Sequence, residues 1–172
     1  MPVCVTPQPH RKSTCEPTLS WYDLPAEVKQ LLIAAATTWE DTAQSQAYIQ
    51  KALTIAHQSL DVLVAAYRYF FYKHNNSAAL TMATQVIERI KQLEQLPESW
   101  ELLAPILRER QEDITIRLYL NAYAASGLIL ARMGAIAEAV EITSRVSELD
   151  TKGEFGAATV LQILTHSDDE ED

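Results

Sequence analysis

Glycine is scarce in this sequence, with four residues among 172. They stand at positions 127, 134, 153 and 156. Phosphate-binding loops and dinucleotide-binding turns need several glycines at close, fixed spacing, so both kinds of nucleotide site are excluded. Ala, Leu, Gln and Glu are abundant instead, and these residues favour helix because they lose little freedom on entering one. We therefore expect an all-α fold.

Long apolar runs are also lacking. No stretch of about 18 consecutive apolar residues is present, so we expect no membrane-spanning helix and no membrane partner. Residues 1–25 have no apolar core of the kind that a secretory signal peptide needs. The expected location is the cytoplasm.

Positive charge is in the minority: 14 Lys and Arg stand against 23 Asp and Glu, which gives a formal net charge of −9. The last five residues, Asp168 to Asp172, are all acidic. An acidic chain repels the phosphate backbone that supplies most of the affinity for nucleic acid. The sequence therefore predicts no nucleic-acid partner.

Cysteine occurs only twice, at Cys4 and Cys15, with His10 between them. This spacing matches no common zinc pattern and offers no fourth ligand. Neither cysteine lies at a helix start or in a glycine loop, and no serine lies in a nucleophile-elbow sequence. We predict two free thiols, no metal site, no cofactor and no catalytic residues, and hence a protein that is not an enzyme.

The pattern of apolar residues predicts one helical domain over 21–166. It lies between a flexible N-terminal arm, 1–20, and an acidic tail, 167–172. Polar interruptions at 40–42, 74–77 and 95–99 divide it. The expected helical segments follow Pro25 and then cover 43–56, 60–72, 78–93, a long stretch from 100 to 133, 135–149 and 154–164.

An internal repeat is most evident near the C-terminus. Gly127 is followed by Leu130 three residues later, by Gly134 after four more and by Ala139 after a further five. This pattern resembles the tetratricopeptide repeat, with one repeat over 120–153 and looser ones over 26–59 and 60–93, separated by an insertion over 94–119. The resemblance implies a short right-handed α–α superhelix of about three helix pairs, with an inserted helix and a C-terminal capping helix. Small residues at 127 and 139 would let the two helices of a pair cross closely.

The other two repeats depart from the pattern. In the second, Phe70 fills the large position, but His74 replaces the turn glycine and Tyr67 stands where a small residue is usual. In the first, Ser45 and Ile33 are weak matches. The insertion carries Trp100 and several leucines at helical spacing, so it could pack on the repeats or occupy their groove.

The resemblance also implies a binding surface, because in this family the first helix of each pair lines a concave groove. On this register Tyr67 and Phe70 point inward. The residues that would line the groove are Arg68, Phe71, Tyr72, Asn121, Leu128 and Arg132. Aromatic and arginine side chains are common binding hot spots. The alternative interpretation is that the aromatic residues of 67–73 simply fill the core.

The sequence therefore predicts a non-enzymatic protein–protein interaction module, such as an adaptor, an assembly factor or a small chaperone. Its partner would be another protein or peptide, bound as an extended segment or a helix in the groove. The alternative is a regulatory subunit that acts mainly through self-association, for example as a homodimer.

Overall fold

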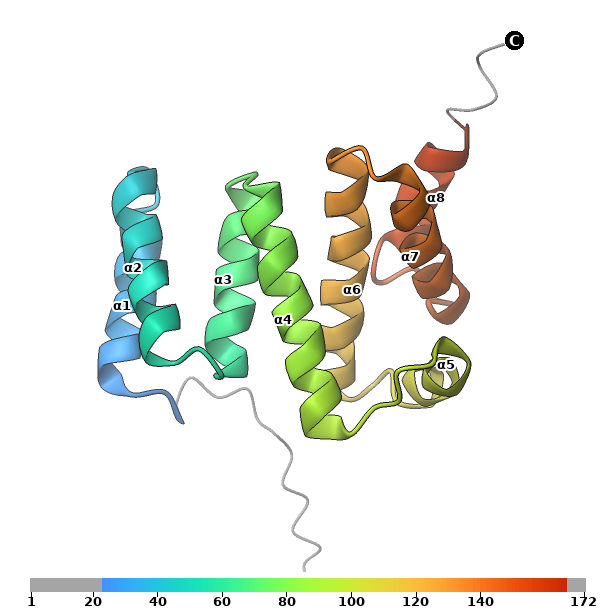
Figure 1. Cartoon of the computed structure of the whole chain (residues 1–172), viewed down its shortest axis with the longest axis horizontal. Helices are drawn as coiled ribbons and strands as arrows, with labels where there is room; N and C mark the ends of the chain where they lie inside the picture. Colours follow the sequence, from blue (N-terminus) through green and yellow to red (C-terminus); the bar gives the residue numbers. More distant parts are fainter. Residues whose placement is uncertain (1–22, 167–172) are drawn as a thin grey trace, which may run out of the picture.

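A computed structural model describes residues 23–166, and these residues form eight α-helices and no strand (Figure 1). The all-α class is confirmed. The predicted arm over 1–20, with Cys4, His10 and Cys15, and the predicted acidic tail over 167–172 lie outside the described residues. The helices are α1 Ala26–Thr37, α2 Thr42–Ile55, α3 Leu60–Tyr72, α4 Asn76–Glu94, α5 Trp100–Glu109, α6 Ile114–Arg132, α7 Ile136–Leu149 and α8 Ala157–His166.

The helices pack as three consecutive pairs, α1–α2, α3–α4 and α6–α7. Helix α4 joins the second pair to the third by packing against α6, and α8 packs against α7 at the C-terminal end (Figure 1). The contact between α2 and α3, which joins the first pair to the second, is much smaller than the contact between α4 and α6. The first pair is thus the least firmly attached.

The three pairs bury equivalent positions. Each second helix buries a small or modest residue one turn after its start, and further residues four and seven positions later, because positions three and four apart share one helix face. The equivalent buried residues are Ser45, Ala79 and Ala139; Ile49, Ala83 and Thr143; and Ala52, Val86 and Val146. Ser45, a weak match by sequence, is fully buried, and its hydroxyl lies 2.6 Å from the Tyr69 hydroxyl.

The turns inside the second and third pairs have the same backbone hydrogen bonds. The Asn75 N–H donates to the Phe70 carbonyl at 3.0 Å, and the Ala135 N–H donates to the Leu130 carbonyl at 2.9 Å. The residue before each donor is left-handed, with φ of 59° at His74 and 82° at Gly134. His74 therefore takes the backbone conformation of the turn glycine that it replaces, which glycine adopts more easily.

Gly127 allows a close crossing of α6 and α7. A Cβ atom added there would lie 2.9 Å from Cγ2 of Thr143 and 3.2 Å from Cγ2 of Ile142. Ala139, the other small residue expected at this crossing, is fully buried. The predicted close approach of these two helices is therefore confirmed.

The long helical stretch predicted from Trp100 to Met133 is wrong, because a turn at 110–113 divides it into α5 and α6. Arg110 holds this turn: its Nε donates to Asp113 Oδ2 at 2.7 Å and its Nη2 to Glu94 Oε2 at 2.6 Å. The Gln111 side chain also donates to the Leu149 carbonyl at the end of α7. These contacts stabilise a turn where the residue types alone favour helix.

Helix α5 packs on the stack and does not occupy a groove. Leu103 and Leu107 join the hydrophobic core that α3, α4, α6 and α7 share. Trp100 lies near Tyr123 of α6 and beneath the guanidinium of Arg145 of α7, at 6.1 Å between the ring centroids and 5.1 Å from the guanidinium to the ring. Arg145 also donates to the Tyr123 hydroxyl at 3.2 Å, and this hydrogen bond raises the pKa of Arg145. The start of α5 is thus held against both neighbouring helices.

Among the described residues, α6 is the one helix that is long and apolar enough to cross a membrane by length and composition alone. An 18-residue window of this helix has a mean hydropathy of 1.3, and 61% of that window is buried inside the protein. Its position explains the composition: α6 packs between α4 and α7, and its side chains contribute to the shared core. A central helix of a stack is apolar on several faces for this reason.

The C-terminal helix begins later than predicted. Residues 154 and 155 were expected to be helical, but the Asp150 carboxylate accepts the N–H groups of Glu154 and Phe155, each at 2.8 Å, and fixes a turn there. Within α8, Ala157 is buried against the stack and Ala158 is exposed.

The close crossing at Gly127 leads to a test of packing. Gly127→Ala should lower the free energy of unfolding by about 1–3 kcal/mol, because the new methyl group overpacks against Thr143. Thr143→Ser removes that Cγ2 atom and keeps the hydroxyl that donates to the Ala139 carbonyl at 2.7 Å. In urea unfolding, the double variant should recover part of the loss. Ala137→Leu, on the exposed side of α7, is the matched control for added volume. If Gly127→Ala lowers the free energy of unfolding equally with and without Thr143→Ser, the added methyl group is not in steric contact with Thr143.

Candidate functional site

A hollow of about 370 Å³ lies between α3 and α6, the first helices of the second and third pairs. We call it the α3–α6 hollow; it is lined by Tyr67, Arg68, Phe71, Tyr72, Asn121 and Ala125. Four of the six residues predicted to line a groove therefore lie around one depression.

The other two predicted residues, Leu128 and Arg132, come from the end of α6. The Arg132 guanidinium lies 4.9 Å from the centre of the Phe71 ring, so it borders the same depression. Leu128 is half-buried. It stands three residues after Ala125 and four before Arg132, which places it on the same face of α6. Leu128 is not among the residues that line the hollow.

The aromatic segment of α3 divides between core and surface. Tyr67, Tyr69 and Phe70 are buried, with exposures of 6%, 6% and 2%. Tyr72 is 66% exposed, Arg68 is exposed and Phe71 is half-buried. The core interpretation thus holds for Tyr67, Tyr69 and Phe70, and the groove interpretation stays a prediction for the other three residues. The inward residues are core, and the remaining three form a surface.

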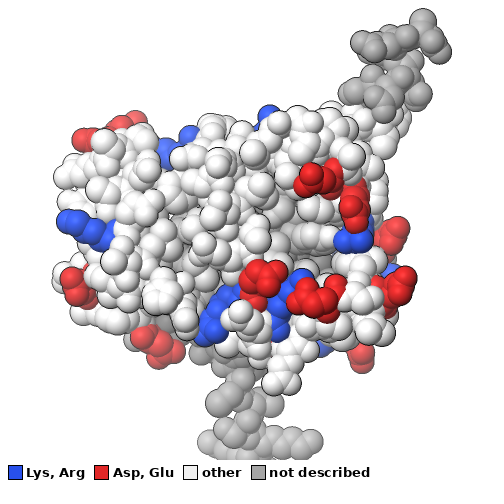
Figure 2. All heavy atoms as spheres, viewed as in Figure 1, with Lys and Arg blue, Asp and Glu red and all other residues white. Residues whose placement is uncertain are grey.

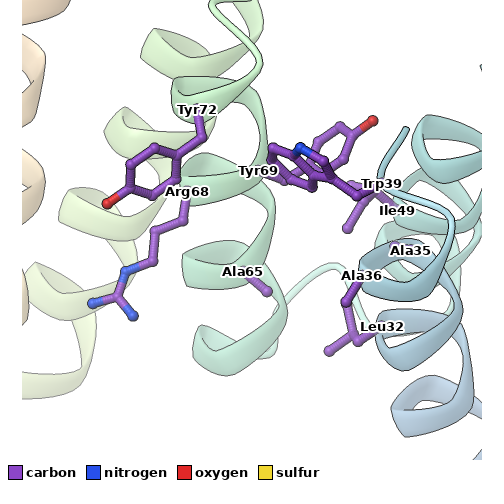
Figure 3. A pocket seen from close by; sticks show the side chains of 9 residues that line it. All are labelled: Leu32, Ala35, Ala36, Trp39, Ile49, Ala65, Arg68, Tyr69 and Tyr72. Carbon is purple, nitrogen blue, oxygen red and sulfur yellow. The ribbon is translucent and has the colours of Figure 1, made fainter. Parts of the chain in front are cut away.

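A second depression, which the sequence did not indicate, lies between α1 and α3 (Figure 3). We call it the α1–α3 cleft; its volume is about 250 Å³ and its nine lining residues are labelled in the figure. Leu32 and Ala36 of α1, Ile49 of α2 and Ala65 of α3 contribute apolar walls. Arg68 and Tyr72 line this cleft as well as the α3–α6 hollow, so the two depressions adjoin on α3.

The cleft exists because α1 has small side chains where the other first helices have large ones. Ala35, two residues before the end of α1, stands at the position of Phe70 in α3 and Leu130 in α6, and all three are buried. The next residue, Ala36, stands at the position of Phe71; it is exposed and also lines the cleft. The missing volume leaves α1 and α3 apart where a larger residue would join them. The equivalence of positions could have revealed this feature in the sequence.

One end of the cleft is closed by a group of side chains around Trp39. The Trp39 and Tyr69 rings meet edge to face at 5.4 Å (Figure 3). Lys73 Nζ lies 4.2 Å from the Trp39 ring centre. The Lys73 ammonium also donates to the Trp39 carbonyl and to the Thr42 hydroxyl. This group, with the Ser45–Tyr69 hydrogen bond, is the main polar connection between the first pair and α3.

The charges around the two depressions differ from those of the rest of the protein. Among the described residues, the ion pairs join other arginines and lysines to carboxylates, and none includes Arg68 or Arg132. Several of them gather where α4, α5 and the start of α6 meet, and the opposite charges lie mixed there at the lower edge in Figure 2.

Asp61, in the first turn of α3, has a raised pKa because of burial and because Asp23 carries the same charge.

Within residues 23–166, no group of three His, Cys, Asp or Glu residues could hold a metal ion. The hollow and the cleft are lined by aromatic, aliphatic, arginine and asparagine side chains. Such side chains hold a ligand by apolar contact and hydrogen bonding, and they provide no paired nucleophile and base.

The division of the aromatic segment can be tested by stability. Phe70→Ala should lower the free energy of unfolding by about 3–5 kcal/mol, because it removes a buried ring. Phe71→Ala combined with Tyr72→Ala should cost much less and should leave the helical circular dichroism unchanged, since these rings are partly solvated. Thermal and urea unfolding of the three proteins measures both effects. A double variant as unstable as Phe70→Ala would show that the exposed rings are part of the core.

Comparison with known proteins gives one relative. No protein-family model matches the chain. No solved structure matches it either. The chain is 30% identical over 145 residues to the uncharacterized 19.8 kDa protein in the nifW 5′ region of Azotobacter chroococcum mcd 1, and the match covers 82% of this chain and 80% of that protein. The chain therefore belongs to the family of this Azotobacter chroococcum protein.

Proposed function

We propose that this protein is a non-enzymatic protein–protein interaction module whose helix pairs form a tetratricopeptide-like, right-handed superhelix. The equivalent buried positions of the three pairs support this arrangement, as do the matching turns at His74 and Gly134. In such an array the first helices α1, α3 and α6 share one face. The partner lies on that face, as an extended segment or a helix.

The observation that carries the proposal is the exposed part of α3. Arg68 and Tyr72 are exposed between two depressions, and Phe71 lies half-buried under Arg132. An exposed tyrosine beside an apolar cleft does not stabilise the folded protein. A partner that covers this tyrosine buries a large apolar area at small entropic cost. Tyrosine and arginine are also enriched among the residues that dominate binding energy.

The module acts as an adaptor, an assembly factor or a small chaperone in the cytoplasm. The relative from Azotobacter chroococcum is named for its place in the nifW 5′ region. We therefore take the products of genes that neighbour the chain's own gene as the first candidate partners.

A capture experiment tests the proposal. The tagged full-length chain is compared with the Phe71→Ala and Tyr72→Ala double variant, and captured proteins are quantified by mass spectrometry. The partner should be lost from the double variant, with binding weakened by about 2 kcal/mol or more in a subsequent titration, as truncation of hot spots predicts. Leu102→Ala is the matched control, because Leu102 of α5 is 64% exposed and lines neither depression.

Two results would contradict the proposal. Equal capture by the parent and the double variant would show that the partner binds elsewhere. If the parent captures only a second copy of itself, with twice the monomer mass in light scattering, the regulatory subunit that acts through self-association replaces the interaction module.

A further inference from the structure

We propose that the two adjoining depressions together bind two neighbouring side chains of a partner segment. A bulky apolar side chain enters the α1–α3 cleft, and a carboxylate beside it binds in the α3–α6 hollow. The partner segment is thus acidic and apolar. This inference rests on the proposed function and specifies the partner's chemistry.

The α1–α3 cleft has the size and the surface for one large apolar side chain. Its volume is about 250 Å³, and a cavity of about 150 Å³ already accommodates benzene. The Tyr69 hydroxyl is paired with Ser45, so it presents only its ring to the cleft. A polar side chain placed there would lose water without gaining a partner. An aromatic or branched aliphatic side chain would bury its apolar surface against Leu32, Ile49 and the Trp39 ring.

The α3–α6 hollow has the opposite character. Besides Phe71 and Ala125, its lining residues are Arg68, Asn121 and two tyrosines, and no carboxylate is among them. Arg132 borders it over Phe71. In Figure 3, Arg68 and Tyr72 extend from α3 away from α1, which is the side of the hollow. Neither Arg68 nor Arg132 is in an ion pair with a carboxylate of the described residues, and two such arginines in a protein of net charge −9 favour an acidic group on the ligand.

Neither terminal segment of this chain has the required combination. The acidic segment Asp168–Asp172 has no apolar side chain for the cleft. Residues 1–22 include Trp21 and Tyr22, but their basic residues Arg11 and Lys12 outnumber their one acidic residue, Glu16. The charge of the hollow therefore favours a segment of another protein.

The test uses a displayed library of random dodecapeptides, selected against the purified full-length chain. The enriched peptides should carry an aromatic or large aliphatic residue with Asp or Glu nearby. Ala36→Phe places in α1 the side chain that α3 has at the equivalent position, so it should fill the cleft and weaken binding of the best peptide about tenfold or more. Arg68→Glu should weaken the same peptide by at least as much and should remove the acidic preference when the selection is repeated.

Two matched controls keep the test specific. Ala137→Phe adds the same volume to an exposed position of α7, and Arg108→Glu reverses a charge on the exposed side of α5. Both should bind the peptide as the parent does. Ala36→Leu serves as a second filling variant if Ala36→Phe lowers the melting temperature.

The outcomes separate this inference from the proposed function. Loss of binding in the Phe71→Ala and Tyr72→Ala variant, with no effect of Ala36→Phe or Arg68→Glu, would overturn the two-part site and leave the interaction module standing. Binding unaffected by all of these changes, or a library without an enriched peptide, would overturn both. Selection of a peptide that resembles residues 1–22 would show that the chain's own N-terminal segment is the occupant and would overturn the inference.

Discussion

Close contact between the two helices of each pair is the constraint on which this structure depends. It requires a small or modest side chain one turn into each second helix, a position filled by Ser45, Ala79 and Ala139. In the third pair the constraint is strictest, because Gly127 leaves no room for a Cβ atom beside Thr143. Once the pairs close in this way, each has an apolar side that only a neighbouring pair can cover. The stack follows from that need.

The candidate site arises where this covering is incomplete. Between the second and third pairs, Tyr67 and Phe70 fill the space, and the packing of α4 against α6 is extensive. Between the first and second pairs, the small side chains of Ala35 and Ala36 leave the α1–α3 cleft open. Site and core are thus built from equivalent positions, and the size of the side chain decides which of the two results.

The sequence predicts the helices and most of the candidate site, since both depend on local periodicity. Arg68, Phe71, Tyr72 and Asn121 were assigned from repeat spacing, and they do lie around one hollow. The failures have a common physical cause. The turns at 110–113 and 150–155 are fixed by side chains that reach other segments, such as Arg110 to Glu94. Helix α6 is apolar because of its neighbours. The cleft depends on a side chain that is absent, and periodicity does not register missing volume.

The unequal connection of the pairs has a consequence for cooperativity. The contact between α2 and α3 is small, although core residues and the group around Trp39 and Tyr69 join the first pair to α3. The third pair is tied to α4, α5 and α8 by core and ion pairs. In a linear array, stability is a sum of unit and interface terms, so the unit with the weakest interface opens at the lowest free energy. Helices α1 and α2 therefore form a separate opening unit whose amide protons exchange before those of α6. A ligand held between α1 and α3 would strengthen the weak interface between the first and second pairs. It would thereby raise the free energy needed to open α1 and α2 separately from the rest of the molecule.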